Sequence, residues 1–297
     1  MYMTNKGLLK ECEKYGIEYY KKGRVLVWHD EFDEGKIDPD KWCFRRTMNS
    51  NDREYDNTEK HARIDDNNLH MQVYRSEIEG LNYSLPEGIT TWGSMNYKYG
   101  YLEMRAKVPY RHGAWPSFWE QSCTVFQKTP WMSEIDIFEM FSSKDTLCAN
   151  LHKWGYKTHC MYDKVVSYTF ENFQNLNEEY HVYGLEWDEK ELNFYVDDIK
   201  FGTIPIDPVN GNFGYEKIDG TSGFHDFHFV IMNNEIFSPA SKFQPEGAVL
   251  TDEDEMPIDY YIDWIRLYQN PEKEELKLKD EIDASIAAKK AAEEEKK

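Results

Sequence analysis

The stretch Trp131-Met132-Ser133-Glu134-Ile135-Asp136-Ile137-Phe138-Glu139-Met140-Phe141 places three carboxylates in an otherwise apolar run. Its Ile and Phe content is typical of a β-strand, in which residues two apart share a face. Glu134 and Asp136 therefore point to the same side. Glu139 lies three residues after Asp136, so a regular strand would bury its charge unpaired, at a cost of several kcal/mol. A one-residue bulge at Ile137-Phe138 would return Glu139 to the side of the other two acids, and we predict one there.

Three acids on one strand face repel one another, so they stabilise a sheet poorly but separate their pKa values well. One carboxylate stays ionised while another is held protonated, which is the division that glycoside hydrolysis requires. The alternative is a polar strand face exposed to water, which is common in antiparallel sheets. The flanking residues are apolar and aromatic, as at perturbed sites in clefts. We therefore favour a catalytic role for Glu134, Asp136 and Glu139.

The segment Glu134-Ile135-Asp136-Ile137-Phe138-Glu139 resembles the catalytic signature Glu-x-Asp-x-x-Glu of family 16 glycoside hydrolases. This bulged form occurs in laminarinase-like, agarase and carrageenase members, whereas lichenases and xyloglucan-active enzymes carry Glu-x-Asp-x-Glu. The resemblance implies hydrolysis with retention at the anomeric carbon. Glu134 would attack that carbon, and Glu139 would protonate the leaving oxygen and then activate water. Asp136 would hydrogen-bond the nucleophile and tune its charge.

A second segment, His112-Gly113-Ala114-Trp115-Pro116-Ser117-Phe118-Trp119, is similar to the family's "glycine-x-tryptophan-proline-alanine-phenylalanine-tryptophan" strand. Its two tryptophans share one face, and the resemblance places Trp115 beside the scissile bond. An isolated Trp would by default belong to the core. His152 follows on the next polar strip, where a structural role and a substrate contact are equally open. The expected substrate-binding residues are Trp115, Trp119, Trp131, His152, Trp154 and Asn233.

Many short segments with period-two alternation, separated by turn signals and without a βαβ rhythm, predict an all-β sandwich. In the clearest segment, Leu102 and Met104 face inward, while Glu103 and Arg105 face water. Asp197-Asp198 is predicted to be the turn of a hairpin. The family resemblance makes the expected fold more specific: a β-jelly-roll sandwich of two curved antiparallel sheets with a concave substrate cleft.

Three parts of the chain differ in composition. Residues 1–23 form an N-terminal extension, in which Leu8, Cys12 and Tyr15 recur at helical spacing and predict a short amphipathic helix. Residues 24–270 are expected to form the glycoside hydrolase catalytic domain. Residues 271–297 are rich in Lys, Glu and Ala and lack aromatics. We expect this charged C-terminal tail to be a solvated helix or a disordered end.

The composition narrows the class of partner. Fifty-five acidic against 35 basic residues give a net charge of −20, which argues against nucleic acid and anionic membranes as partners. A heavily sulfated polysaccharide is disfavoured for the same reason, although a local basic pocket could override the global sign. Aromatic residues make up 15% of the chain, and their rings suit stacking on sugars. A neutral polysaccharide fits best, bound by a protein that we expect to be a monomer.

The five cysteines are Cys12, Cys43, Cys123, Cys148 and Cys160, and none belongs to a Cys-x-x-Cys pair. This pattern excludes a disulfide-rich scaffold or a zinc ribbon and is typical of buried small side chains. No apolar run approaches the length of a membrane span, and Met1 to Gly7 lack the hydrophobic region of a signal peptide. We therefore expect a protein that acts in the cytoplasm, or a secreted one whose leader has been removed.

A structural calcium is a further implication of the resemblance. Family members often hold this ion between an acid of the opening strand and an acid of the last strand, which here would be Glu31 and Asp263. Oxygen ligands suit calcium. Two surface acids on neighbouring strands would give the same pattern. The chemistry itself is expected to require no cofactor.

The motifs favour an endo-acting enzyme that cleaves β-1,3-glucan or mixed β-1,3/1,4-glucan. A β-galactan hydrolase of the agarase or porphyranase type is the alternative, in which Arg45-Arg46 and Arg53 would contact hydroxyl or sulfate groups. A lectin-like glycan-binding protein on the same sandwich also stays open, because a fold does not fix a function. The presence of all three acids argues against the lectin.

Overall fold

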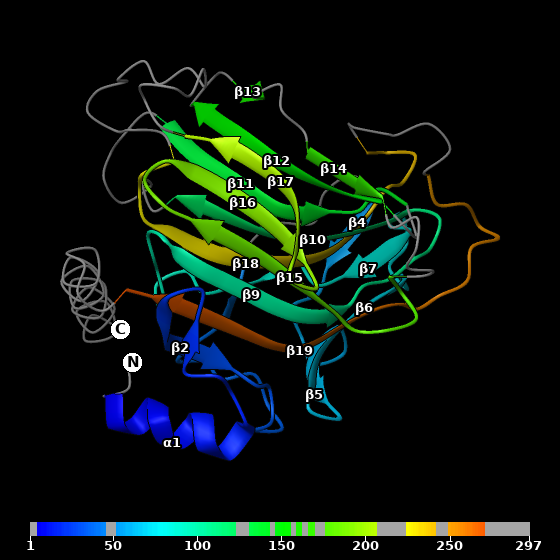
Figure 1. The fold of residues 1–297 in the computed structure, drawn as a ribbon. Coiled ribbons are helices and arrows are strands. Elements are labelled where there is room, and N and C mark those ends of the chain that lie inside the picture. The colour runs from blue at the N-terminus through cyan, green and yellow to red at the C-terminus, as the bar shows by residue number, and fades with distance from the viewer. Residues whose placement is uncertain are drawn as a thin grey trace, which may run out of the picture.

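The computed structural model describes residues 5–45, 52–122, 131–142, 146–155, 159–161, 166–169, 176–206, 224–241 and 249–270. They form two sheets that stack on one another (Figure 1). The eleven strands of sheet A are β1 Tyr20–Lys21, β2 Arg24–Asp30, β4 Arg53–Tyr55, β5 Ala62–Asp65, β6 Asn68–Arg75, β7 Tyr83–Leu85, β9 Gly100–Lys107, β15 His181–Trp187, β16 Glu191–Val196, β17 Ile199–Pro205 and β19 Ile258–Gln269. The eight strands of sheet B are β3 Cys43–Phe44, β8 Ile89–Thr90, β10 Ala114–Ser122, β11 Trp131–Glu139, β12 Thr146–Gly155, β13 His159–Met161, β14 Val166–Thr169 and β18 His228–Ile236.

The core lies between the two sheets, and strand alternation decides which side chains enter it. Leu102 and Met104 of β9 are completely buried, as predicted from their alternation with charged residues. Phe118 of β10 and Ile135 of β11 meet them from sheet B within the same apolar cluster. Neighbouring strands are antiparallel except for the short pair β4 and β7. The predicted β-jelly-roll sandwich is therefore confirmed.

Strand β11 is an inner strand of sheet B, and β10 and β12 pair with it on either side. Ile135 points between the sheets, so Glu134 and Asp136 point to the opposite face of sheet B. We call this the site face. Residues of β10 and β12 that pair in register with the acids share it, and β18 pairs in turn with β10, which places side chains from distant parts of the sequence around the carboxylates.

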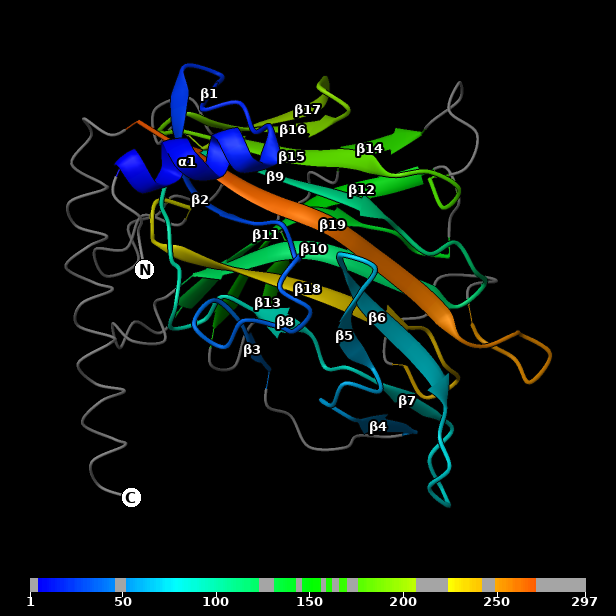
Figure 2. The ribbon, with the colours of Figure 1, turned by 90° about the horizontal axis from the view of Figure 1, so that it is seen from below.

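The N-terminal extension carries helix α1, Asn5–Tyr15, which lies across the face of sheet A that points away from sheet B (Figures 1 and 2). Leu8 and Cys12 pack there against tyrosines of β9, β16 and β19. The helix ends before Gly16, whose φ of +66° is the left-handed conformation that terminates helices and favours glycine. The C-terminal tail, residues 271–297, lies outside the described residues.

Glu103 corrects one detail of the predicted pattern. It was expected to face water from β9, yet only 1% of it is exposed. The strand pair β1 and β2 covers this position, and the Lys21 ammonium lies 2.7 Å from the Glu103 carboxylate. The wet face of an antiparallel sheet thus ends where the N-terminal extension crosses it.

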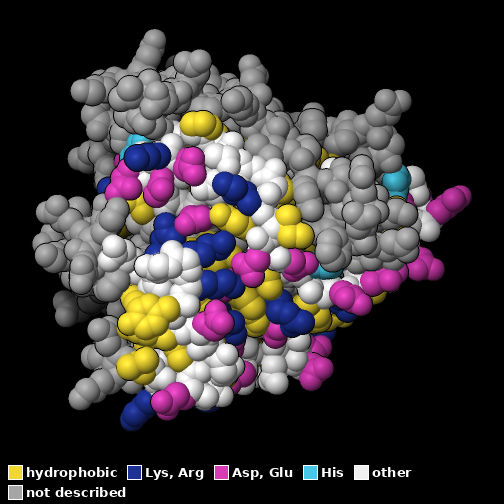
Figure 3. Space-filling model, viewed as in Figure 1, with side chains coloured by type: hydrophobic (Ala, Val, Ile, Leu, Met, Phe, Trp, Pro, Cys, Tyr) yellow, Lys and Arg dark blue, Asp and Glu magenta, His cyan; other side chains and the backbone are white. Residues whose placement is uncertain are grey.

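The charged side chains on the molecular surface are mixed in sign. On the face seen in Figure 3, Lys and Arg side chains gather in a central column with Asp and Glu side chains along it. Several charged side chains of the molecule form ion pairs, such as Arg24 with Glu186 at 2.8 Å. Among the described residues on that face, acidic side chains thus interrupt the basic column.

The remaining sequence expectations concern thiols and membranes. Cys12, Cys43 and Cys148 form no disulfide among the described residues; Cys12 is buried, and the other two are partly exposed. The side chains of Cys123 and Cys160 lie outside the described part of the chain. Within that described part, no helix combines the length and apolarity needed to cross a membrane.

Candidate active site

The catalytic strand contains the predicted bulge. The two consecutive β10 residues Phe118 and Trp119 pair with Phe138 and Asp136, so Ile137 is the extra residue of β11. The pairing with β12 shifts between Asp136 and Glu139 as well. Phe138 turns into the core, and Glu139 returns to the site face.

Two neutral donors contact the Glu139 carboxylate. The Trp115 indole Nε1–H donates to Oε1 over 2.9 Å, and the Asn150 amide donates to Oε2 over 2.7 Å. Burial raises the pKa of Glu139, while these two hydrogen bonds oppose the rise because they favour the ionised form. Glu139 thus has a raised pKa, and two N–H donors stabilise its carboxylate once the proton has left.

Asp136 is the most buried of the three acids, with 3% of it exposed. Burial and the neighbouring Glu139 raise the pKa of Asp136 well above its ordinary value, and the two carboxyl groups share a hydrogen bond. Two carboxyl groups in such contact need a proton between them. The two carboxyl groups therefore favour a shared proton over two negative charges. The sequence predicted Asp136 beside Glu134; the structure also brings it against Glu139.

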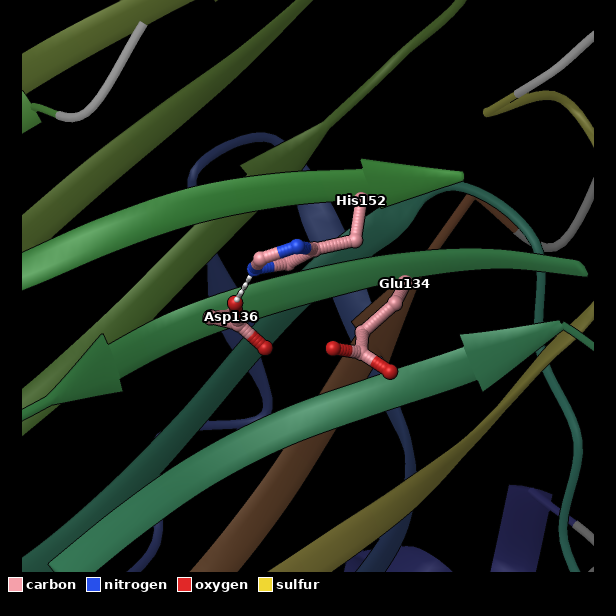
Figure 4. Close-up of side chains that lie close together, drawn as sticks. All are labelled: Glu134, Asp136 and His152. Carbon is pink, nitrogen blue, oxygen red and sulfur yellow. Dashed lines mark ion pairs between the residues drawn. The ribbon is translucent and has the colours of Figure 1, made fainter. Parts of the chain in front are cut away.

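Glu134 is half-buried and lies opposite Gln121 of β10 and His152 of β12. Figure 4 shows Glu134, Asp136 and His152 converging, with His152 Nε2 at 2.9 Å from the Asp136 carboxylate. One donor atom from each of the three lies within 4.8 Å of the others, close enough to hold a metal ion. Because burial and Glu139 both favour the protonated form of Asp136, the arrangement suits acid–base chemistry better than a cation site.

The predicted tryptophans lie along β10 on the site face. Trp115 stacks on Phe237 with ring centroids 4.6 Å apart and planes 5° from parallel, which leaves its N–H directed at Glu139. Trp119 donates its N–H to Asn233 over 2.8 Å and carries the Arg45 guanidinium 5.0 Å from its ring centroid. Asn233 is buried and holds Trp119 in place. The side chains of the predicted Trp131 and Trp154 lie outside the described residues.

The predicted calcium ligands do not form a fitting site. Both Glu31 oxygens accept hydrogen bonds from Arg266, at 3.0 and 2.8 Å, and His29 Nδ1 lies 3.1 Å from one of them. Asp263 forms an ion pair with Arg105. Cationic side chains thus take the oxygens that a calcium ion would need, and we derive no role for calcium from these residues.

Sequence reasoning missed Asn150 as a site residue. Alternation along β12 placed it on the same strip as His152, but its contact with Glu139 depends on the register across the bulge. The interaction between the Trp115 N–H and Glu139 was missed for the same reason. The signal available in the sequence was the position of Asn150, two residues before His152 and therefore on the same strand face.

Comparisons with known proteins agree with this geometry. Residues 49–227 match the family model for glycosyl hydrolases family 16. The endo-1,3-1,4-beta-glycanase ExsH of Rhizobium meliloti is 28% identical over 194 residues, which cover 64% of this chain and 35% of that protein. A beta-glucanase of Rhodothermus marinus is 25% identical over 254 residues, which cover 82% of this chain and 85% of that protein.

The crystal structure of the laminarinase catalytic domain from Thermotoga maritima matches with a TM-score of 0.69 at 27% identity, covering 83% of this chain and 98% of that one. The chain spans 34 to 38% of the length of three curated relatives, among them ExsH. The family model covers more than half of the chain and includes the bulged strand with its three carboxylates. The chain belongs to glycosyl hydrolases family 16.

Proposed function

We propose that this chain is an endo-acting, retaining glycoside hydrolase that cleaves β-1,3-glucan or mixed β-1,3/1,4-glucan. The observation that carries the proposal is the pair of contacting, buried carboxyl groups of Asp136 and Glu139 beside Glu134 on a bulged strand. The names of the relatives support the substrate: an endo-1,3-1,4-beta-glycanase, a beta-glucanase and a laminarinase.

In the proposed reaction, the Glu134 carboxylate attacks the anomeric carbon and forms a glycosyl ester as the glycosidic bond breaks. Glu139 donates its proton to the leaving oxygen. A water molecule then attacks the ester, Glu139 takes a proton from it, and the sugar leaves with its original anomeric configuration. Asp136 lies against Glu139, so the repulsion between the two carboxyl groups favours return of a proton to the pair in the second step.

Trp115 and Asn150 have a matching role in this scheme. Each donates a hydrogen bond to a different oxygen of Glu139, and such bonds are strongest when the carboxylate is ionised. They therefore stabilise Glu139 after it has given up its proton. Their contribution grows as charge develops, which is the condition for accelerating a reaction.

The alternatives find less support. Arg53, a proposed sulfate contact, is buried and donates to Glu235 and to the Ile236 carbonyl, while Arg45 lies over Trp119. Arg46 lies outside the described residues. A β-galactan hydrolase therefore gains no free cation from Arg53. A lectin would have no use for a pair of acids with raised pKa values.

The test is product release from laminarin, barley mixed-linkage glucan, lichenan, agarose, porphyran and carrageenan. Wild type and Glu134→Ala are compared in parallel. We expect wild type to shorten laminarin or a mixed-linkage glucan and the variant to leave it intact. Cleavage of agarose or porphyran alone would favour the galactan alternative, and binding without cleavage would favour the lectin.

A further inference from the structure

A buried polar network lies behind the catalytic strand, on the face of sheet B that packs against sheet A. Its members are Tyr97, Glu120 of β10, Ser133 of β11 and His228 of β18. The first two and His228 are fully buried, and Ser133 is 5% exposed. The Tyr97 hydroxyl donates to Glu120, whose other oxygen lies 3.4 Å from His228 Nδ1. His228 Nε2 lies 2.9 Å from the Ser133 hydroxyl.

Protonation keeps the network free of net charge. Burial raises the pKa of Glu120 to about 8, so its carboxyl is protonated at neutral pH. Burial lowers the pKa of His228 to about 3, so the imidazole is neutral. Asp226 is the charged group that acts on His228 from outside the network, and it opposes this lowering. Two neutral hydrogen bonds, Tyr97 to Glu120 and His228 to Ser133, thus lie end to end, and the facing Glu120 and His228 atoms are 3.4 Å apart.

The network joins the backbone on both sides of Glu134. Ser133 directly precedes Glu134 along β11, and its N–H donates to Ser122 of β10 over 3.0 Å. Glu120 directly precedes Gln121, the β10 residue that lies opposite Glu134. Adjacent residues of a strand point to opposite faces, so contacts behind the sheet fix the carboxylate in front of it.

We propose that Tyr97, Glu120, His228 and Ser133 form a positioning network that sets the location of Glu134 for attack on the anomeric carbon. This inference rests on the proposed hydrolase function. The four residues act through the backbone of β10 and β11 and touch no substrate. A displacement of about 1 Å can cost roughly a hundredfold in rate, so a smaller shift at Glu134 should be measurable in kcat.

The chain contains a matched control for this network. Ser84 of β7 contacts His61 Nε2 at 2.9 Å, and both residues are fully buried, but they lie in and beside sheet A, away from β11. Ser133→Ala and Ser84→Ala therefore each remove one serine hydroxyl that lies 2.9 Å from a histidine nitrogen. Only the first removal concerns the residue next to Glu134.

We expect both serine variants to lower the urea midpoint of unfolding to a similar extent. Ser133→Ala should lower kcat on the glucan that wild type cleaves by roughly tenfold while KM changes little, because the chemical step is affected rather than binding. Ser84→Ala should leave kcat unchanged. Equal kcat values for the two variants would show that the network contributes only to stability and does not position Glu134.

Glu120 supplies a test by conservative replacement. Gln is neutral, has nearly the shape of the protonated acid and can still accept from Tyr97, so Glu120→Gln should retain kcat within about twofold. Glu120→Ala breaks the chain and should lower kcat at least as much as Ser133→Ala. A loss of kcat in Glu120→Gln equal to that in Glu120→Ala would contradict the proposed neutral network.

Hydrogen exchange gives a readout that needs no substrate. Amides of β11 around Glu134 should exchange faster in Ser133→Ala than in wild type, and those in Ser84→Ala should not. If wild type cleaves none of the polysaccharides tested, the proposed hydrolase fails, yet exchange still decides whether the network holds β11. Unchanged exchange in Ser133→Ala would overturn the positioning claim by itself.

Discussion

Replacement of Trp115 by Phe tests the assignment of Glu139 as the proton donor. The substitution removes the indole N–H that contacts Glu139 Oε1 at 2.9 Å and keeps an aromatic ring to stack on Phe237. That hydrogen bond favours the ionised carboxylate and so lowers the pKa of Glu139. Its removal should raise the pKa, and the enzyme should stay active to higher pH.

The size of the shift follows from the strength of the bond. A hydrogen bond to a charged group contributes about 1.5–3 kcal/mol, and one pKa unit corresponds to about 1.36 kcal/mol. Loss of this hydrogen bond alone would therefore raise the pKa of an isolated carboxyl group by about one to two. Because Glu139 shares a proton with Asp136, the partner takes up part of the change, and we expect the alkaline limb to move upward by about one unit.

The assay is the pH dependence of kcat/KM on the best glucan substrate, which reports the pKa values of the free enzyme. Trp119→Phe is the matched control: it removes an indole N–H on the same strand and face that donates to Asn233 instead of a carboxylate. That variant should leave the alkaline limb in place. A Trp115→Phe profile that shifts downward, or no more than the Trp119→Phe profile, would refute Glu139 as the acid.

Three further predictions concern stability. Glu120, with a pKa raised to about 8 against about 4.3 in the unfolded chain, stabilises the fold most below pH ~4.3 and loses this contribution as the pH rises to 8. His228, with a pKa lowered to about 3 against about 6.5 in the unfolded chain, stabilises the fold above pH ~6.5 and loses this contribution as the pH falls toward 3. Between pH ~4.3 and 6.5 the two groups change the free energy of unfolding in opposite directions, so their effects partly cancel. In urea unfolding, the stability of Glu120→Gln relative to wild type should therefore increase most clearly from pH ~6.5 to 8. A constant difference between the two proteins over that range would contradict this assignment. Gly113→Ala should destabilise by about 2–4 kcal/mol in the same assay, because its φ is +82° and the added Cβ would lie 2.1 Å from the Leu250 side chain; a cost below about 1 kcal/mol would show that Leu250 moves freely. Leu8→Ala should cost about 2–4 kcal/mol of stability by removing a buried contact of α1, and kcat should stay unchanged because α1 packs on the far face of sheet A; a fall in kcat at temperatures where the variant is folded would contradict that separation.

Sequence patterns predicted the parts of this molecule that depend on local rules. Period-two alternation identified the sandwich, and the odd spacing of Glu139 located the bulge. The hairpin turn at Asp197-Asp198 was predicted correctly, since both residues have positive φ and join β16 to β17. These features follow from neighbouring residues alone.

The parts that sequence missed depend on strand register and on coverage by distant segments. Asn150 reaches Glu139 only because the bulge shifts the pairing of β11 with β12. Glu103 is buried because the N-terminal extension crosses its strand. Glu31 accepts hydrogen bonds from Arg266, which lies 235 residues further along the chain. No pattern within one segment reports such contacts, which require the folded arrangement.

The central claim is that Glu134 attacks the anomeric carbon and becomes covalently linked to the sugar. The most direct measurement is peptide mapping by mass spectrometry after incubation with a fluorinated laminaribioside that traps glycosyl-enzyme esters. The account predicts one added glycosyl group on Glu134, and no labelling of the Glu134→Ala variant. A label on Glu139, or turnover of glucan by an enzyme that is never labelled at Glu134, would contradict it.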